Sequence, residues 1–324
     1  MAHLSLSLAR VRSWRPAPTT LRRTFLGALV ANAGIVVTGG AVRLSASGLG
    51  CPTVPRCTDT SMVVTREMGV HGFIEFGNRM LTFVLTAAVV AATVTAWRAG
   101  RRDLTRLAGV LVLGIVAQAV LGAVTVLTGL NPVTVMGHFL LSMVLIAVAT
   151  YAYEVSRGSR TTRELVVRRE VRAGARLLSV VTAAVLVLGT VVTGTGPHSG
   201  DANATHRLPF DLESVAQLHA DLVFLLVGLA VGVLLALRAT GAPAEAVRRS
   251  TVALAVVLAQ GVVGYAQYLT DLPVLLVGVH VLGATLVWIA ALRVLLATTV
   301  RVAGPPGELA PRTAEPASLV VPAA

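Results

Sequence analysis

The amino-acid sequence predicts an all-α membrane protein whose eight transmembrane helices form two pseudo-symmetric four-helix bundles, related by a parallel internal repeat. Three observations support this prediction. The 324 residues are 55% hydrophobic and only 13% charged, with a mean hydropathy of +0.79. Eight apolar segments reach the roughly 20 residues that a helix needs to cross a bilayer. Polar residues of the first half also recur in the second half at a constant offset.

The composition excludes several classes of protein. A soluble chain carries about 25% charged residues, and a disordered chain has a far lower apolar content. The formal charge of +12 comes from an excess of arginine. In a membrane protein such an excess marks topology, so we expect no nucleic-acid partner. Two cysteines are too few for a disulfide-rich scaffold.

The eight segments are expected to be helices, because lipid offers no partner for backbone amides. In chain order they cover about residues 24–42, 70–97, 108–128, 134–153, 177–195, 214–237, 251–270 and 274–299. The predicted organisation is a cytoplasmic N-terminal segment (1–23), a first four-helix bundle (24–155), a basic cytoplasmic linker (156–176), a second four-helix bundle (177–300) and a disordered tail (301–324).

Arginine positions predict the orientation of these segments. Most of the 27 basic residues lie before the first segment, after an even-numbered segment or near the end of the chain. The connections on the other side hold only Arg43, Arg56, Arg66 and Arg207. The positive-inside rule therefore predicts a multi-pass protein of the cell membrane with both termini in the cytoplasm. The first segment is long for the core of a signal peptide, and we expect it to remain as an anchor.

The two halves of the chain show an internal repeat. Residues of the first half match residues of the second at an offset of 142: Gln118 and Gln260, Gly122 and Gly264, Leu127 and Leu269, and His138 and His280. A Gly-x-Val-Val-Thr-Gly motif occurs at residues 34–39 and again at 189–194. Each unit has four spans, an even number, so both units cross the membrane in the same direction.

Four histidines carry the strongest functional signal. His71, His138, His219 and His280 lie in the second, fourth, sixth and eighth segments, each near the predicted outer end. An ionisable residue inside a membrane helix is a functional candidate. For any single histidine, a hydrogen bond between helices is the alternative interpretation. One histidine at similar depth in every even-numbered segment favours function.

The arrangement of these histidines is typical of haem ligands. Imidazoles on facing helices of a bundle hold haem iron from both sides. We expect His219 and His280 to form one pair, and His138 to form a second pair with a residue of segment 70–97. Zinc or copper would require three or four converging ligands. Glycines beside the histidines would admit a flat macrocycle, although such residues also serve ordinary helix packing.

Segment 70–97 differs from its counterpart in the second half. Steps of four and three residues place His71, Glu75 and Asn78 on one helix face, with Arg79 beside it. A buried carboxylate needs a partner or a task, so Glu75 either pairs with Arg79 or acts on a substrate. When Asn78 is aligned with His219, the residue of the second half that matches Glu75 is Ala216, which is not an acid. We therefore expect a reactive first bundle and a second bundle that transfers electrons.

Three further groups lie in or near the predicted outer loops. Cys51 and Cys57 fall on the oxidising side of the membrane, where they form a disulfide or remain as two thiols. His198 either reaches a haem or belongs to a solvated loop. Asp221 is an intramembrane acid, for which a hydrogen bond to a neighbouring group is the default expectation.

Taken together, these motifs resemble those of the haem A synthase family. The residues that carry the resemblance are Gly39–Leu44, Ser47–Pro52 with Cys57, Glu75–Arg79, Gly137 and His138, Gly194–Asp201, His219–Asp221 and His280. The resemblance extends over most of residues 25–295. It implies eight helices in two bundles, in agreement with the segments and the repeat.

The resemblance also implies cofactors and roles. Haem b would be ligated by His219 and His280 in the second bundle. The first bundle would bind haem O, with His138 as an iron ligand and Glu75 as the catalytic carboxylate. A ring methyl would be oxidised to a formyl group by successive hydroxylations, with water as the oxygen source. The Cys51 and Cys57 pair matches an outer-loop disulfide of some members.

One position departs from the family pattern. Many members carry a histidine where this chain has Asn78. Either His71, two turns nearer the outside, takes the place of that ligand, or His138 is the single protein ligand of the substrate haem. We expect His71 to be a ligand or a near neighbour, with Asn78 and Arg79 also close to the substrate.

Two other functions were compared with the synthase. A membrane cytochrome that transfers electrons between two haems without substrate chemistry would not need Glu75. A transporter should have broken helices at the midplane, whereas the polar residues here gather near one end. The electron acceptor, a quinone or another carrier, is not specified by any motif. Haem O synthase and oxidase assembly factors are expected partners on pathway grounds, and the lipid bilayer is the expected surroundings.

Overall fold

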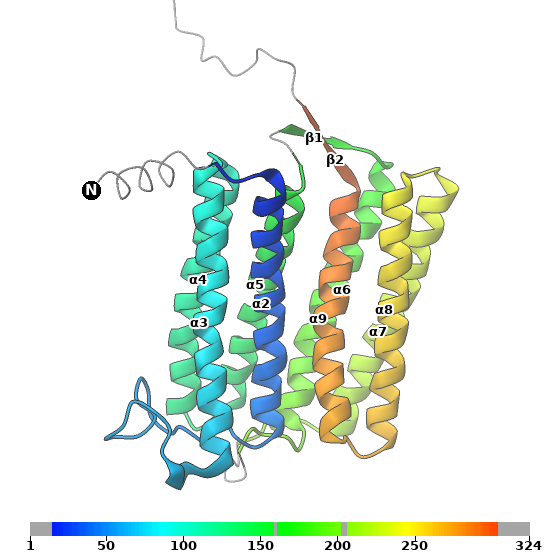
Figure 1. The fold of residues 1–324 in the computed structure, drawn as a ribbon. Helices are drawn as coiled ribbons and strands as arrows, with labels where there is room; N and C mark the ends of the chain where they lie inside the picture. The colour runs from blue at the N-terminus through cyan, green and yellow to red at the C-terminus, as the bar shows by residue number, and fades with distance from the viewer. Residues whose placement is uncertain (1–14, 159–160, 202–205, 304–324) are drawn as a thin grey trace, which may run out of the picture.

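The computed structural model describes residues 15–158, 161–201 and 206–303. These residues form eight long α-helices, one 3-10 helix and two β-strands (Figure 1). In chain order the elements are α2 (Pro18–Leu44), η1 (Arg66–Met68), α3 (Gly69–Arg98), α4 (Arg102–Leu127), α5 (Pro132–Ser156), β1 (Thr161–Leu165), α6 (Arg169–Thr195), α7 (Leu212–Ala239), α8 (Ala244–Leu269), α9 (Val274–Ala297) and β2 (Thr299–Ala303).

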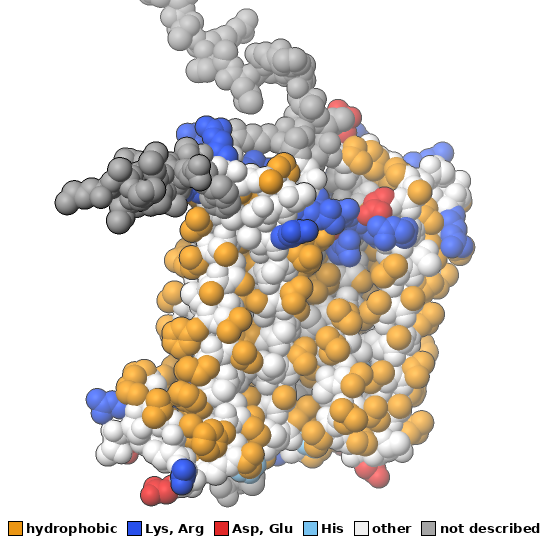
Figure 2. Space-filling model, in the orientation of Figure 1, with side chains coloured by type: hydrophobic (Ala, Val, Ile, Leu, Met, Phe, Trp, Pro, Cys, Tyr) orange, Lys and Arg blue, Asp and Glu red, His pale blue; other side chains and the backbone are white. Residues whose placement is uncertain are grey.

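All eight long helices are long and apolar enough to cross a membrane, which confirms the predicted fold class and the number of spans. Many large apolar side chains on their outer faces are exposed, including Leu113, Phe83 and Val262, each at about 70%. Figure 2 shows such side chains along the whole length of the helices. A soluble protein rarely exposes apolar patches of this size. The molecule is therefore a multi-pass membrane protein.

The helices pack as two sets of four (Figure 1). In the first set, α2 and α4 each contact both α3 and α5, so α3 and α5 occupy opposite corners of a four-helix ring. In the second set, α6 and α8 each contact both α7 and α9 in the same way. Buried apolar side chains form one cluster within each set, with Phe25 and Ile146 in the first and Leu178 and Leu237 in the second. The pseudo-symmetry of the two sets stays a prediction.

Helix starts follow local sequence signals. Pro18 and Pro132 occupy first-turn positions, where a missing N–H costs no helical hydrogen bond. Asn131 caps α5 by accepting a hydrogen bond from the backbone N–H of Val133 (2.9 Å). Asp211 caps α7 in the same manner through Ser214 (2.7 Å), and this hydrogen bond lowers the pKa of the Asp211 carboxyl group.

The connection between the two sets is more structured than the sequence suggested. The predicted linker 156–176 contains β1, and α6 already begins at Arg169. Strand β1 pairs antiparallel with β2, so that Thr161 lies opposite Ala303. Alternating strand patterns were not apparent because this ribbon is only five residues long on each side. Residues 1–14 and 304–324, most of the predicted N-terminal segment and tail, lie outside the described residues.

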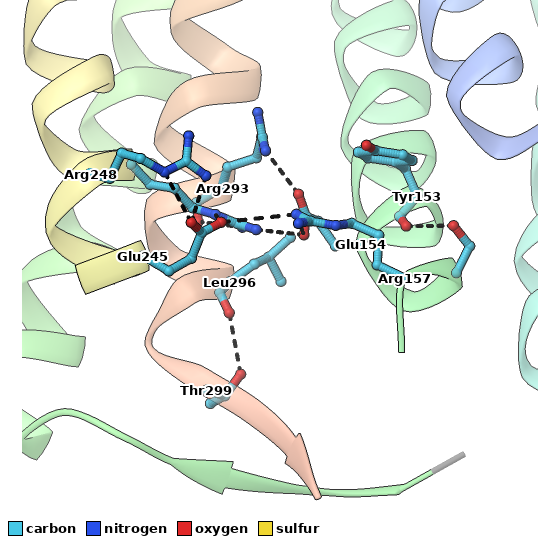
Figure 3. A network of polar contacts seen from close by, with 10 residues as sticks. Tyr153, Glu154, Arg157, Glu245, Arg248, Arg293, Leu296 and Thr299 are labelled. Atoms are coloured by element: carbon cyan, nitrogen blue, oxygen red, sulfur yellow. Dashed lines mark hydrogen bonds and ion pairs between the residues drawn. The ribbon is translucent and has the colours of Figure 1, made fainter. Parts of the chain in front are cut away.

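Polar contacts join the two sets near the strands. Glu154 of α5 accepts hydrogen bonds from Arg249 of α8 (2.8 Å) and from Arg293 of α9 (2.9 Å) (Figure 3). Arg157 and Glu245 extend this network on either side. Deeper in the interface, the indole N–H of Trp288 donates to the carbonyl of Met143 (2.8 Å). These contacts fix α5 against α8 and α9.

Candidate functional site

The candidate site lies at the end of the helices opposite to the two strands. The loop of residues 45–65 lies at this end (Figure 1). His71 is in the first turn of α3, and His138, His219 and His280 follow about two turns into α5, α7 and α9. The four histidines therefore lie near one end of the helices, as the sequence predicted.

In the second set, His219 and His280 occupy helices at opposite corners of the ring. Each imidazole ring packs against a glycine of a neighbouring helix: a Cβ at Gly189 or Gly264 would lie 3.2 Å from Cε1 of the respective histidine. Nδ1 of both rings is buried without a hydrogen-bond partner, although the Val185 carbonyl lies near the His219 ring. Two such rings can ligate one metal from opposite sides.

In the first set, His138 has the surroundings of His280. A Cβ at Gly122 would lie 3.2 Å from its Cε1, the same distance as for Gly264 and His280. Gln118 donates to the backbone carbonyl of His138 (3.1 Å), as Gln260 donates to that of His280 (2.8 Å). Nδ1 of His138 is likewise buried and unpaired. The sequence offset had paired these residues, but it did not show that the glutamine and glycine hold the histidine.

Asn78 of α3 occupies the position in the first set that corresponds to His219 in the second set. Its side-chain oxygen accepts a hydrogen bond from Thr38 of α2 (2.8 Å). Gly39 is the α2 glycine next to it, since a Cβ there would lie 3.9 Å from Nδ2 of Asn78, whereas a Cβ at Gly34 would meet nothing within 4 Å. Asn78 therefore faces α2 as His219 faces α6, with an amide in place of an imidazole.

Glu75 lies one turn from Asn78 and is almost fully buried, with 5% of its surface exposed. Its Oε1 pairs with Arg79 (2.6 Å), and its Oε2 accepts a hydrogen bond from the backbone N–H of Cys51 (2.5 Å). Arg79 also donates to the carbonyls of Cys51 (2.7 Å) and Thr53 (3.0 Å). The ion pair that the sequence offered as an alternative is thus present. It is part of a larger network that fixes the loop on α3.

A disulfide joins Cys51 and Cys57 within this loop, as predicted. Both cysteines are buried. Gly50 touches the backbone of His71 so closely that a Cβ would collide with it. The loop is therefore seated directly on the start of α3, above Glu75.

His71 is an exposed residue whose Nδ1 lies 2.9 Å from Oγ of Ser47. Ser47 is fully buried and forms a β-bridge with Asp201 of the loop after α6. A hydrogen bond at Nδ1 orients the ring and leaves Nε2 as the nitrogen available to another partner. The structure thus places His71 at the loop contact between the two sets, two turns from Asn78.

Arg43 provides a second link between the loops, which the sequence did not reveal. Its Nε donates to the carbonyl of His198 (2.7 Å), and Nη2 donates to that of Thr193 (3.0 Å). His198 in turn lies 3.0 Å from the carbonyl of Leu272 through Nε2. The Arg43 side chain therefore holds the backbone carbonyl of His198, and the Leu272 carbonyl holds its imidazole.

Two other predictions can be compared with the geometry. Asp221 accepts a hydrogen bond from Gln217 on its own helix (2.7 Å), and its side chain is exposed on the outer face of α7. Among the described residues, no group of three or more histidines, cysteines or acids could hold a metal ion.

Comparison with known proteins identifies relatives. A family model described as cytochrome oxidase assembly protein, COX15-CtaA, matches residues 22–292. The haem A synthase of Listeria monocytogenes serovar 1/2a is 28% identical over 165 residues, 49% of this chain and 54% of the relative. The haem A synthases of Geobacillus kaustophilus (30% over 119 residues; 36% and 37%) and Lysinibacillus sphaericus (31% over 131 residues; 38% and 42%) also match. The chain thus spans about half the length, or less, of these curated relatives.

Proposed function

Because this chain belongs to the COX15-CtaA family of cytochrome oxidase assembly proteins, we propose that it is a haem A synthase, an oxidoreductase that converts haem O to haem A. The relatives described above bear this name. Arginines gather at the end of the helices that carries the strands (Figure 2). This distribution supports a cell-membrane protein with cytoplasmic termini and its haem sites toward the outer surface.

Haem b is proposed to bind between His219 and His280. The fit rests on two imidazoles from opposite helices, each with a buried Nδ1 and each packed against a glycine. Bound there, haem b would supply a one-electron carrier for the oxidation. The protein holds the two rings in place through the contacts with Gly189 and Gly264, which leave no room for a Cβ without displacement.

Haem O is proposed to bind in the first set, beside His138, with Asn78 and Arg79 near it. His138 has the same contacts as His280, which supports the same role as an iron ligand. Asn78 is held by Thr38 and offers an amide where the second set offers His219. His71 is proposed as a ligand or near neighbour through Nε2, since Ser47 occupies Nδ1.

Glu75 is proposed as the catalytic carboxylate. Arg79 and the Cys51 amide hold its charge in a buried position. There the carboxylate would stabilise positive charge that develops as the ring methyl is oxidised, or accept a proton released in that step. The oxygen atom of the formyl group would come from water through successive hydroxylations, and the electrons would leave to a quinone or another acceptor.

The difference between two otherwise matched sites is the observation that carries this proposal. A cytochrome that only transfers electrons would need two similar haem sites. Here one site has a bis-histidine arrangement, whereas the other replaces one histidine by Asn78 and adds the buried Glu75. Haem O synthase and oxidase assembly factors are proposed partners, because they would supply the substrate and receive the product.

Substitution Glu75→Gln tests the proposal. The amide keeps the size of the side chain but removes its charge, so we expect haem A formation to fall by about 100-fold or more, while the haem b spectrum is retained. The measurement is extraction and chromatography of haems from cells that supply haem O. The exposed Glu67→Gln variant in η1 is the matched control. Unchanged haem A formation in the Glu75 variant would exclude the catalytic role of Glu75, whereas no haem A formation by the unsubstituted protein would favour the electron-transfer cytochrome.

A further inference from the structure

A groove lies at the turn between α3 and α4, at the end of the helices near the two strands and remote from the histidines. Its volume is about 650 Å³, and it is lined by Trp97, Gly100, Arg102, Thr105 and Arg106. Gly100 makes the tight turn between the helices with a φ of +62°. Trp97, the penultimate residue of α3, is 65% exposed. None of these residues belongs to the proposed haem sites.

The groove is lined by two arginines, Arg102 and Arg106. Arg102 and Arg106 lie on one face of α4, four residues apart. Neither side chain makes a hydrogen bond or ion pair with another residue that the structure describes. The adjacent acid, Asp103, is held instead by Arg101, whose Nε and Nη2 lie 3.0 and 2.8 Å from its two oxygens. Arg101 is itself anchored to the carbonyls of Val155 and Gly158.

The position of the groove suits the headgroup layer of a membrane. Trp97 lies at a helix end, where tryptophan concentrates at membrane interfaces, and the Arg98 guanidinium lies over its ring at 5.4 Å. The strand end of the helices is the arginine-rich end (Figure 2). Guanidinium groups bind phosphate oxygens in a bidentate manner, and anionic lipids attract basic groups next to a membrane span.

The corresponding turn of the second set lacks these features. At the repeat offset, Arg106 matches Arg248, but Arg248 pairs with Glu245 at 2.5 Å. Arg102 and Trp97 match Ala244 and Ala239. Two arginines that pair with no residue in the described part of the chain, beside an exposed tryptophan, therefore distinguish the α3–α4 turn from its counterpart, and are not a general consequence of membrane orientation.

We propose that the α3–α4 groove binds the phosphate headgroup of an anionic phospholipid. Arg102 and Arg106 bind the phosphate oxygens, and Trp97 packs against the glycerol and upper acyl region. The site would anchor the first set of helices to the membrane independently of haem chemistry.

The test is a titration of the purified full-length protein, in a zwitterionic detergent, with phosphatidylglycerol or phosphatidylcholine, followed by native mass spectrometry. We expect one phosphatidylglycerol to bind in preference to phosphatidylcholine. Arg106→Ala should weaken its binding about 5-fold and Arg102→Ala with Arg106→Ala about 25-fold, at roughly a factor of 5 per arginine. Arg248→Ala, which removes the same charge from the matched turn, should change binding less than 2-fold. Arg106→Gln provides a second variant that keeps much of the side-chain length.

Equal weakening by Arg106→Ala and Arg248→Ala would show a non-specific charge effect and overturn the site. Displacement of the lipid by millimolar inorganic phosphate at constant ionic strength would indicate a free-phosphate site and overturn the lipid assignment. Trp97→Ala should reduce phosphatidylglycerol binding, because the indole packs against the glycerol and upper acyl region; unchanged binding would overturn this part of the site. Thermal unfolding of each variant, measured without lipid, should match that of the unsubstituted protein.

Discussion

The first and second helix sets hold one histidine in the same way, His138 in the first and His280 in the second. They differ at the helix that lies across from this histidine. His138 and His280 each receive a glutamine at the backbone carbonyl and a glycine against the ring, with the same 3.2 Å approach. Across the ring, the second set has His219, whereas the first has Asn78 bound to Thr38. Only the first set adds a buried carboxylate and a disulfide loop above it.

This difference would give the two sets separate tasks if they bind the haems as proposed. The contacts around one histidine are the same in both sets, as expected where a change would displace a haem ligand. The opposite corner differs, since the first set has an amide there in place of an imidazole. We therefore expect stability of haem binding to be greatest in the second set and reactivity to be confined to the first.

Removal of His280 or His138, the histidines that the two sets hold alike, should have the largest effect. His280→Ala should abolish the haem b signal of the purified protein, because no other described side chain is placed to replace that ligand. His138→Ala should retain this signal and lose haem O binding. Optical spectra before and after addition of haem O measure both effects. If His280→Ala and His138→Ala lost the same signal, the assignment of separate sites to the two sets would be wrong.

Conversion of the differing corner should have the next largest effect. Asn78→His gives the first set the imidazole that the second set has. We expect a second bis-histidine spectrum when haem O is bound, with haem A formation retained, because many members of the family that this chain resembles carry a histidine at this position. Asn78→Gln is the control, since it extends the amide without adding a ligand. An unchanged spectrum in Asn78→His would contradict the proposed place of Asn78 beside the substrate haem.

Removal of the disulfide should affect only the first set. The loop closed by Cys51 and Cys57 is short, so the chain-entropy estimate is about 2 kcal/mol of stability. Substitution of both cysteines by serine should lower the thermal midpoint and reduce haem A formation, because the Cys51 amide and carbonyl hold Glu75 and Arg79. The haem b spectrum at room temperature serves as the internal reference. A loss of haem b equal to the loss of activity would show that the loop supports the whole molecule.

Substitution of the ring-packing glycines should have the smallest effect, and it should be equal in the two sets. Gly264→Ala and Gly122→Ala each place a Cβ 3.2 Å from an imidazole carbon, so that the ring must shift by a few tenths of an ångström. We expect haem affinity to fall by about tenfold, in the range found for groups that orient a metal ligand. Gly261→Ala, where a Cβ meets nothing within 4 Å, is the control. Unequal effects at Gly122 and Gly264 would show that the two histidines are not held alike.

Much of the site could be predicted without coordinates, and particular residues show why the rest could not. The histidines were apparent because a polar residue within an apolar span stands out locally, and the offset of 142 paired His138 with His280. Arg43, by contrast, gave no signal of its contact with His198, which lies 155 residues away in the sequence. The ion pair of Glu75 with Arg79, four residues on, was one of two alternatives that the sequence offered, but the amide of Cys51 was missed because it lies across a loop.

The sequence by itself determined the eight spans, their arginine-marked ends, the depth of the histidines and the cysteine pair. These features depend on hydropathy and spacing along one helix, which are local properties of the chain. The tertiary structure decided which glycine faces each imidazole, which loop lies on Glu75, how Glu154 joins α5 to α8 and α9, and that a short ribbon connects residues 161–165 with 299–303. Each of these features depends on how the helices rotate about their axes and pack against one another. In an apolar sequence, many rotations of a helix bury a similar area of surface. Only the complete set of contacts therefore selects one arrangement of the helices.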